Sequence, residues 1–227
     1  MKKNILVVAA HPDDEIIGIG GTIARYAKQG HTCRCLILGE GQTARTQTRS
    51  LSEPALVEKL RQDTLLAAEA VGYAQVCFED LPDNRFDSID RLDVIKKIEA
   101  YLEQIKPDTI YTHYAHDLNI DHQICLQAVL TATPPVNHQT TPREIFTFET
   151  LSSTEWNFGH AFSPNIFVNI EDFIDQKLAA LSYYQSEIRP APHPRSLEII
   201  RANARRWGSV IGVNYAEAFQ VVRSIRY

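Results

Sequence analysis

The sequence predicts an α/β fold in which a mostly parallel sheet carries helices on both faces. Short apolar runs alternate with segments of helical spacing from the start of the chain. The first run, residues 5–10, is apolar without interruption, which is typical of a strand buried on both faces of a parallel sheet. A helical segment and a second apolar run follow it, and together they predict a βαβ unit.

In the first half of the chain, turn residues separate the predicted elements. In chain order these are a strand over 4–10, a helix over 14–29, a strand over 32–38, a helix over 53–70 and a strand over 75–79. Gly30 and Gly72 end the two helices, since glycine readily takes the left-handed conformation found after a last helical turn. The loop 39–50, rich in Gly, Thr and Arg, follows the carboxyl end of a strand, so we expect it to border the functional site.

The second half of the chain continues the alternation after a turn at Pro82-Asp83-Asn84. The predicted elements are a helix over 89–105, a strand over 109–113, a helix over 121–132, strands over 144–149 and 165–170, helices over 171–184 and 195–206, and a strand over 217–223. Pro134 stops the helix 121–132. We expect the proline-rich segment 189–194 to be an ordered surface crossing rather than a domain boundary.

Length and composition predict one domain over residues 1–227, of which 44% are hydrophobic. The net charge is −5 and no basic block stands out, which argues against a nucleic-acid surface. The apolar stretches are shorter than the roughly 18 residues of a membrane span, and no cleavable signal pattern opens the chain, so we expect a cytoplasmic protein. The four cysteines, Cys33, Cys35, Cys77 and Cys125, are predicted to be buried apolar side chains.

A charged cluster, His11-Pro12-Asp13-Asp14-Glu15, follows the first strand at the edge where open α/β sheets bind ligands. With Pro12 at the first helical position, His11 and Asp14 can converge while Asp13 points elsewhere. An imidazole and a carboxylate are two of the three protein ligands that a hydrolytic zinc ion needs, which leaves a second carboxylate free. The alternative is that the acids only favour a helix N-terminus, but that leaves His11 unexplained.

A third ligand is expected from the segment 113–122, the other dense group of His and Asp residues, because it follows the predicted strand 109–113. We favour His122, in the first turn of the next helix, with Asp121 or a nearby carbonyl orienting its ring. His113 and His116 are the rival ligands.

The residues resemble the PIG-L/LmbE-like zinc N-deacetylases, which carry a His-Pro-Asp-Asp-Glu box after the first strand of a Rossmann-like fold. The box is matched in full at residues 11–15, and a distal His-containing element is matched in part. Further similar stretches are Gly18-Ile19-Gly20-Gly21, Arg61-Gln62-Asp63, Ala67-Ala68, Gly72, Leu81-Pro82-Asp83-Asn84-Arg85 and Ala216-Glu217-Ala218-Phe219. The resemblance implies that His11, Asp14 and His122 bind the metal and that Asp13 is the general base.

The distal element departs from the family pattern at Asn119, where many relatives have a histidine that polarises the carbonyl or protonates the amine. Asn119 can donate a hydrogen bond but cannot move a proton. His113 or His116 is the expected substitute, and we predict a catalytic role for His116 and substrate contact for His113 and Asn119. The resemblance also places Arg61 and Asp83 near the substrate.

The sequence therefore predicts a metal-dependent hydrolase that removes an acetyl group from an N-acetylglucosamine-type small glycoconjugate or glycan precursor. Zinc is the expected ion, and ferrous iron suits the same ligands. The resemblance also implies a homo-oligomer. One alternative is an amidase for another N-acyl or thiol conjugate. The other is a nucleotide-binding Rossmann protein using the glycines of 18–21, which the acidic turn disfavours because it would repel phosphate.

Overall fold

The computed structural model describes residues 2–41, 54–137 and 141–226. Within these ranges the strands form one seven-stranded sheet in the order β3-β2-β1-β4-β5-β7-β6. The strands are β1 Asn4–Ala9, β2 Thr32–Gly39, β3 Gln75–Leu81, β4 Thr109–His113, β5 Glu144–Phe148, β6 Ile166–Asn169 and β7 Ala216–Ser224. Only β7 runs antiparallel to its neighbours, so the predicted mostly parallel sheet is confirmed.

The strand order reverses between β1 and β4. From β1 the chain builds outward through β2 to β3, whereas β4 and β5 lie on the other side of β1. Such a reversal opens a crevice at the carboxyl ends of the two central strands. The backbone N–H of Ala10, just after β1, donates to Nε2 of His113, the last residue of β4, at 2.8 Å. The two segments predicted to carry the site are therefore neighbours in space.

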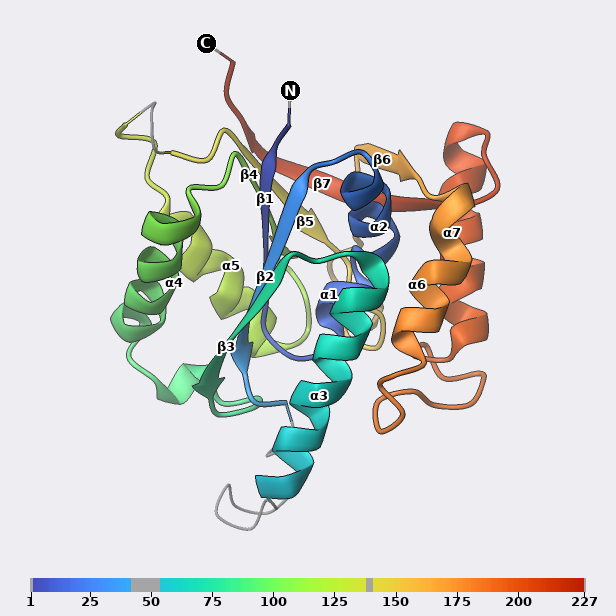
Figure 1. Cartoon of the computed structure of the whole chain (residues 1–227), viewed down its shortest axis with the longest axis horizontal. Helices are drawn as coiled ribbons and strands as arrows, with labels where there is room; N and C mark the ends of the chain where they lie inside the picture. The colour runs from blue at the N-terminus through green and yellow to red at the C-terminus, as the bar shows by residue number, and fades with distance from the viewer. Residues whose placement is uncertain (1, 42–53, 138–140, 227) are drawn as a thin grey trace.

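Helices cover both faces of the sheet, as Figure 1 shows. One face carries α4 Arg91–Ile105 and α5 Ile120–Ala132, and the other carries α1 Asp14–Ile17, α2 Gly20–Lys28, α3 Pro54–Val71, α6 Ile174–Leu181 and α7 Leu197–Ile211. Short 3₁₀ turns lie at η3 Phe86–Ser88, η4 Thr154–Trp156 and η5 Glu171–Phe173. Alternate residues of β1 contribute to the two apolar cores, which explains why the whole strand is apolar.

Three of the predicted helices differ from the structure. The helix expected over 14–29 is broken into α1 and α2. The helix expected over 89–105 is α4, which begins at Arg91, after the 3₁₀ turn η3. The first residues of the helix expected over 171–184 form the 3₁₀ turn η5, and α6 begins after it at Ile174. Pro12 precedes the helix instead of opening it, because α1 begins at Asp14. The predicted loop 39–50 and the start of the helix predicted over 53–70 lie largely outside the described residues, which resume at Pro54.

A buried ion pair occupies the break between α1 and α2. In an unbroken helix the carbonyl of Ile17 would accept from the N–H of Gly21. Here Ile17 O accepts from Lys177 Nζ at 2.7 Å, and Gly21 N donates to Glu217 Oε1 at 3.0 Å. Lys177 and Glu217 pair with each other at 2.6 Å. Two side chains from distant parts of the chain thus replace one helical hydrogen bond.

The glycines near this break allow close packing. A Cβ on Gly18 would lie 2.2 Å from the Phe148 ring, and one on Gly21 would lie 2.7 Å from Ile170. Side chains thus fill the space beside Gly18 and Gly21, so a larger residue at either position would clash. The broken helix can therefore lie directly against the end of β5.

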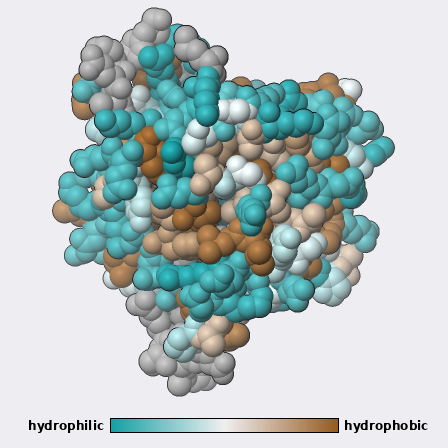
Figure 2. All heavy atoms as spheres, viewed as in Figure 1, coloured by the Kyte–Doolittle hydropathy of each residue, from teal (hydrophilic) through white to brown (hydrophobic). Residues whose placement is uncertain are grey.

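Strand β3 forms one edge of the sheet. In the view of Figure 2, hydrophobic residues gather where β3 lies in Figure 1, and Val76, Cys77 and Phe78 are half-buried. Ion pairs Arg61–Asp80 and Lys97–Glu79 flank the strand. Charged side chains of this kind discourage pairing of an edge with another chain.

No helix in the described part of the chain is long and apolar enough to cross a bilayer.

We predict that Lys177→Met lowers the free energy of unfolding by about 3–5 kcal/mol, because it leaves Glu217 as an unpaired buried charge. Denaturant titration measures this loss. The double variant Lys177→Met/Glu217→Gln removes both charges and should be more stable than the single variant. A single variant as stable as the wild type would contradict the role of the pair.

Candidate metal centre

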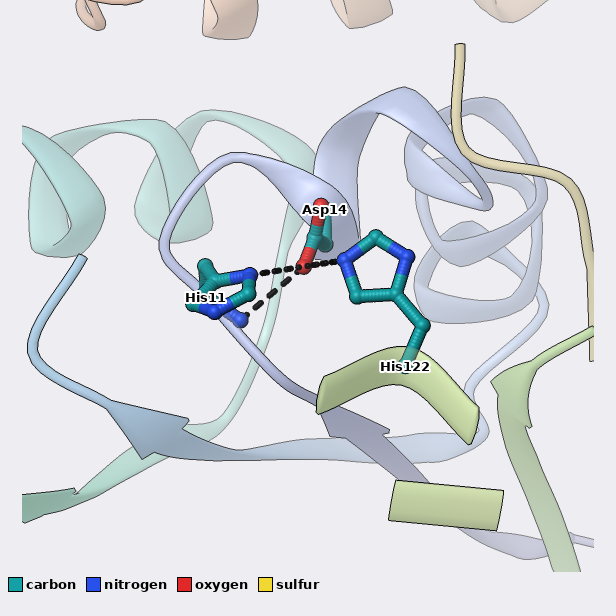
Figure 3. Close-up of side chains that lie close together, drawn as sticks. All are labelled: His11, Asp14 and His122. Atoms are coloured by element: carbon teal, nitrogen blue, oxygen red, sulfur yellow. Dashed lines mark hydrogen bonds and ion pairs between the residues drawn. The ribbon is translucent and has the colours of Figure 1, made fainter. Parts of the chain in front are cut away.

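Three buried side chains from two distant segments meet at the carboxyl ends of β1 and β4. His11 follows β1, Asp14 is the first residue of α1, and His122 lies in the first turn of α5. Asp14 Oδ2 lies 3.4 Å from His11 Nδ1 and 3.3 Å from His122 Nε2. Figure 3 shows the two imidazoles on either side of this carboxylate. Ligand atoms about 2.1 Å from one tetrahedral ion lie roughly 3.4 Å apart, so the spacing suits a metal ion.

The turn that delivers these groups has an unusual backbone. Asp13 has φ of 92°, in the left-handed region that residues other than glycine rarely adopt. The carbonyl of Asp13 accepts from the N–H groups of Ile16 and Ile17 at 3.0 and 2.9 Å, and its own N–H donates to Glu15 Oε2 at 3.0 Å. Tyr184 donates to the other Glu15 oxygen. Burial raises the pKa of Glu15 to about 8.

A second carboxylate lies behind each imidazole. His11 Nε2 is 2.9 Å from Asp121 Oδ2, and His122 Nδ1 is 3.1 Å from Asp117 Oδ1. The prediction that Asp121 orients His122 is therefore wrong. Adjacent residues on a helix point in different directions, so Asp121 faces His11, while Asp117 reaches His122 from the preceding loop. These contacts place the ring protons on the outer nitrogens and leave His11 Nδ1 and His122 Nε2 for an ion.

Two atoms of the cluster lack hydrogen-bond partners among the described residues. These are Asp14 Oδ1 and His122 Nε2, both buried. Leaving a buried polar atom unpaired costs about 1–3 kcal/mol. A divalent cation held by the two imidazoles and the Asp14 carboxylate would give His122 Nε2 a partner, so the donor set fits a zinc ion on both spacing and chemistry.

The charges of the cluster balance one another. Burial lowers the pKa of His122, but Asp14 and Asp117 raise it to about 9. Burial likewise disfavours the charged forms of His11 and Asp14, yet the hydrogen bonds and ion pairs hold the His11 pKa well above and the Asp14 pKa well below their ordinary values. The carboxylates of the cluster thus favour a positive charge between them. A bound cation would supply that charge in place of the protons on the imidazoles.

Asp13 is adjacent to Asp14 in the sequence, but its carboxylate contacts Arg195 and not the imidazoles. Its Oδ2 accepts from Arg195 Nη1 at 2.8 Å, whereas its buried Oδ1 has no hydrogen-bond partner among the described residues. Burial raises the pKa of Asp13 well above its ordinary value, against the opposing charge of Arg195. Of the two acids, one therefore joins the imidazoles and the other keeps a free oxygen, as the sequence predicts.

A model of the family described as "PIG-L: GlcNAc-PI de-N-acetylase" matches residues 6–133. The chain belongs to the PIG-L family. It is 28% identical over 194 residues to a probable N-acetyl-alpha-D-glucosaminyl L-malate deacetylase 2 of Bacillus cereus, covering 82% of this chain and 84% of the relative. It is 26% identical to the diacetylchitobiose deacetylase of Thermococcus kodakarensis, covering 98% and 84% of the two chains. The conserved protein TT1542 of Thermus thermophilus superposes with a TM-score of 0.79 at 25% identity, covering 99% and 97%.

Within this PIG-L domain, His113 does not lie where substrate contact was expected. The side chain is fully buried, Nε2 accepts from the backbone of Ala10, and Nδ1 lies 3.2 Å from Thr150 Oγ1. Its ring stacks on His122 with centroids 3.9 Å apart. As the last residue of a central strand, His113 supports a ligand from inside the protein, and burial lowers its pKa to about 3.

His116 lies on the surface. Its ring stacks on His160 with centroids 4.3 Å apart and contacts none of His11, Asp14 and His122. Its catalytic role stays a prediction.

Asn119, at the position of the usual PIG-L histidine, caps helix α5. Its Oδ1 accepts from the N–H of Asp121 at 2.9 Å, and its Nδ2 donates to Asn84 Oδ1 at 2.9 Å. Both ends of the amide are therefore engaged by the protein. An asparagine is well suited to this position, because N-cap residues satisfy the free N–H groups of a first helical turn.

The two other expected substrate residues lie in different surroundings. Asp83 is buried beside the cluster, with Oδ1 3.3 Å from His11 Nε2. Arg61 instead pairs with Asp80, and its guanidinium lies over Phe78 at 5.5 Å. The structure thus brings Asp83, but not Arg61, into contact with His11 of the candidate metal centre.

Sequence reasoning missed Asp117 and Arg195. Asp117 lies within the His- and Asp-rich segment, so its acidic type was a signal. Arg195 has no such signal, since it follows a proline-rich segment and lies 182 residues from its partner Asp13.

We predict that Asn119→Ala lowers the free energy of unfolding by about 1 kcal/mol, because α5 loses its cap. Asn119→Ser is the matched control, since serine caps helices nearly as well. Chemical denaturation compares the two variants. Equal losses in both would show that the cap contributes nothing.

We predict that zinc raises the thermal unfolding midpoint of the metal-free protein, because a ligand that binds only the folded state stabilises it. The rise should disappear in Asp14→Asn and His122→Gln, and persist in His31→Gln, whose ring contacts Lys3 and Tyr26 away from the cluster. Differential scanning calorimetry with and without zinc measures it. An undiminished rise in both cluster variants would place the zinc elsewhere.

Proposed function

We propose that this PIG-L protein is a zinc-dependent hydrolase that removes the acetyl group from an N-acetylglucosamine-type substrate. One observation carries the proposal. A buried His-Asp-His set with unpaired donor atoms lies beside a second carboxylate, Asp13, whose Oδ1 is free among the described residues. Amide hydrolysis by a metal needs these parts, namely three ligands and a separate base.

The metal ligands would be His11 Nδ1, Asp14 and His122 Nε2. When bound, the ion would lower the pKa of a water molecule to about 7 and polarise the amide carbonyl. Asp121 and Asp117 hold the two imidazoles in the orientation that leaves these nitrogens available. Ferrous iron would suit the same ligands.

Asp13 would carry the proton. Its free Oδ1 takes a proton from the attacking water, and the same carboxyl then returns it to the departing amine nitrogen. The raised pKa suits both steps, because a carboxyl that holds a proton more firmly is the stronger base. Asn119 cannot share this work, since its amide caps α5 and its N–H protons are not acidic enough to be transferred.

The acetylated amino sugar is the common feature of the substrates named for the relatives. One relative is named for an N-acetyl-alpha-D-glucosaminyl L-malate, another for diacetylchitobiose, and a third for a 2-acetamido-2-deoxy-alpha-D-glucopyranoside of inositol. The Asp83 carboxylate lies beside the cluster, with Oδ1 3.3 Å from His11 Nε2, and a carboxylate suits sugar hydroxyls.

The test is acetate release by the zinc-loaded enzyme from N-acetylglucosaminides that differ in the group attached to the sugar. We expect release from some of them, and a loss of at least about 100-fold in kcat in Asp13→Asn with zinc content unchanged. Asp175→Asn, a surface acid paired with Arg201, is the matched control.

Near-normal kcat in Asp13→Asn would exclude Asp13 as the base. Release of acyl groups only from other N-acyl compounds or thiol conjugates would overturn the proposed substrate class.

A further inference from the structure

Arg195 reaches the base from the far end of the chain. It lies on the segment between α6 and α7, and its guanidinium contacts three side chains. Nη1 donates to Asp13 Oδ2 at 2.8 Å and lies 3.5 Å from Glu187 Oε2, while Nε donates to Ser152 Oγ at 2.7 Å. The side chain is 23% exposed, so most of it is enclosed by protein.

The surroundings of Arg195 hold it in place. Its backbone N–H donates to His193 Nδ1 at 3.1 Å, and the next residue, Ser196, caps α7 by accepting from Ile199. Ser152 has a left-handed backbone with φ of 75°, and its N–H donates to Glu155 Oε1 at 2.7 Å. A non-glycine residue in this conformation persists only where its neighbours impose it. The guanidinium is therefore held at both its backbone and its Nε.

The two oxygens of a carboxylate are chemically equivalent. Those of Asp13, Oδ1 and Oδ2, therefore differ only in the groups that surround them. Arg195 binds Oδ2, so Oδ1 is the oxygen left without a hydrogen-bond partner among the described residues. Asp14 and Glu187 add negative charge around Asp13. Without the guanidinium, the Asp13 carboxylate would be free to turn toward a bound cation and compete with Asp14 as a ligand.

We propose that Arg195 is a positioning residue of the enzyme, which holds Asp13 as a base and keeps it from becoming a metal ligand. The inference rests on the proposed function. It assigns a role to a residue outside the segment 6–133 that the family model matches. Arg195 acts through Asp13, since its side-chain hydrogen bonds run to Asp13, Ser152 and Glu187 and not to the cluster of His11, Asp14 and His122.

The kinetic test compares Arg195→Ala and Arg195→Lys with the wild type, all loaded with zinc. We expect kcat of Arg195→Ala to fall by roughly 100-fold, the scale of a general-base contribution, with little change in KM. Lysine should restore part of kcat, and so should guanidinium ions added to the alanine variant. The control Arg189→Ala removes an exposed arginine whose Nη1 donates to the carbonyls of Ser186 and Ile188, and its kcat should equal that of the wild type.

A second readout needs no activity. In metal-free protein, the midpoints of thermal unfolding of Arg195→Ala, Asp13→Asn and the double variant form a cycle that measures the coupling of the two side chains. We expect the double variant to unfold at a higher temperature than the sum of the two single shifts predicts. Strictly additive shifts would overturn the proposal.

The outcomes separate the two proposals. A rise in KM with kcat unchanged would make Arg195 a substrate-binding residue and overturn the positioning role. A wild-type enzyme that releases no acetate from any N-acetylglucosaminide would refute the proposed function, while the unfolding cycle would still decide whether Arg195 holds Asp13.

Discussion

The turn between β1 and α1 has to end a buried strand, begin a helix and send two adjacent carboxylates to different partners. It does so because Asp13 adopts a left-handed backbone, held by the Glu15 carboxyl and by the first N–H groups of α1. Asp14 then faces the imidazoles, and Asp13 faces Arg195. If this backbone relaxed to an ordinary helical start, Asp13 and Asp14 would no longer be directed to these different partners.

Buried charges are paired throughout this region, and the pairs join distant parts of the chain. Arg195 neutralises Asp13, and Lys177 with Glu217 fills the break between α1 and α2. Arg195, Lys177 and Glu217 lie beyond the segment that the family model matches. The cluster residues His11, Asp14 and His122 thus come from the first part of the chain, while the last part supplies charges that hold Asp13 and the break after α1. Such pairs stabilise little by themselves, but losing one partner is costly.

The strands and the meeting of three candidate metal-binding side chains were predictable because their signals are local. The unbroken apolar run of residues 5–10 is typical of a strand buried on both faces, and His11, Asp14 and His122 follow strands whose carboxyl ends meet. The second carboxylates were harder to assign. Asp121 and Asp117 are close in sequence to His122, yet only the direction of each side chain decides that Asp121 holds His11. The buried position of His113 likewise depends on the packing of β4 and not on its residue type.

By itself, the sequence determined the α/β class, the strand positions and the residues able to bind a metal, since each depends on a pattern or residue type within a short segment. The tertiary structure decided the break after α1, the partners of the two imidazoles and the contact between Arg195 and Asp13. These depend on which side chains from remote segments enter the same buried space. Hydrophobic periodicity records which face of an element is buried, but it carries no record of the particular charge that will lie against it.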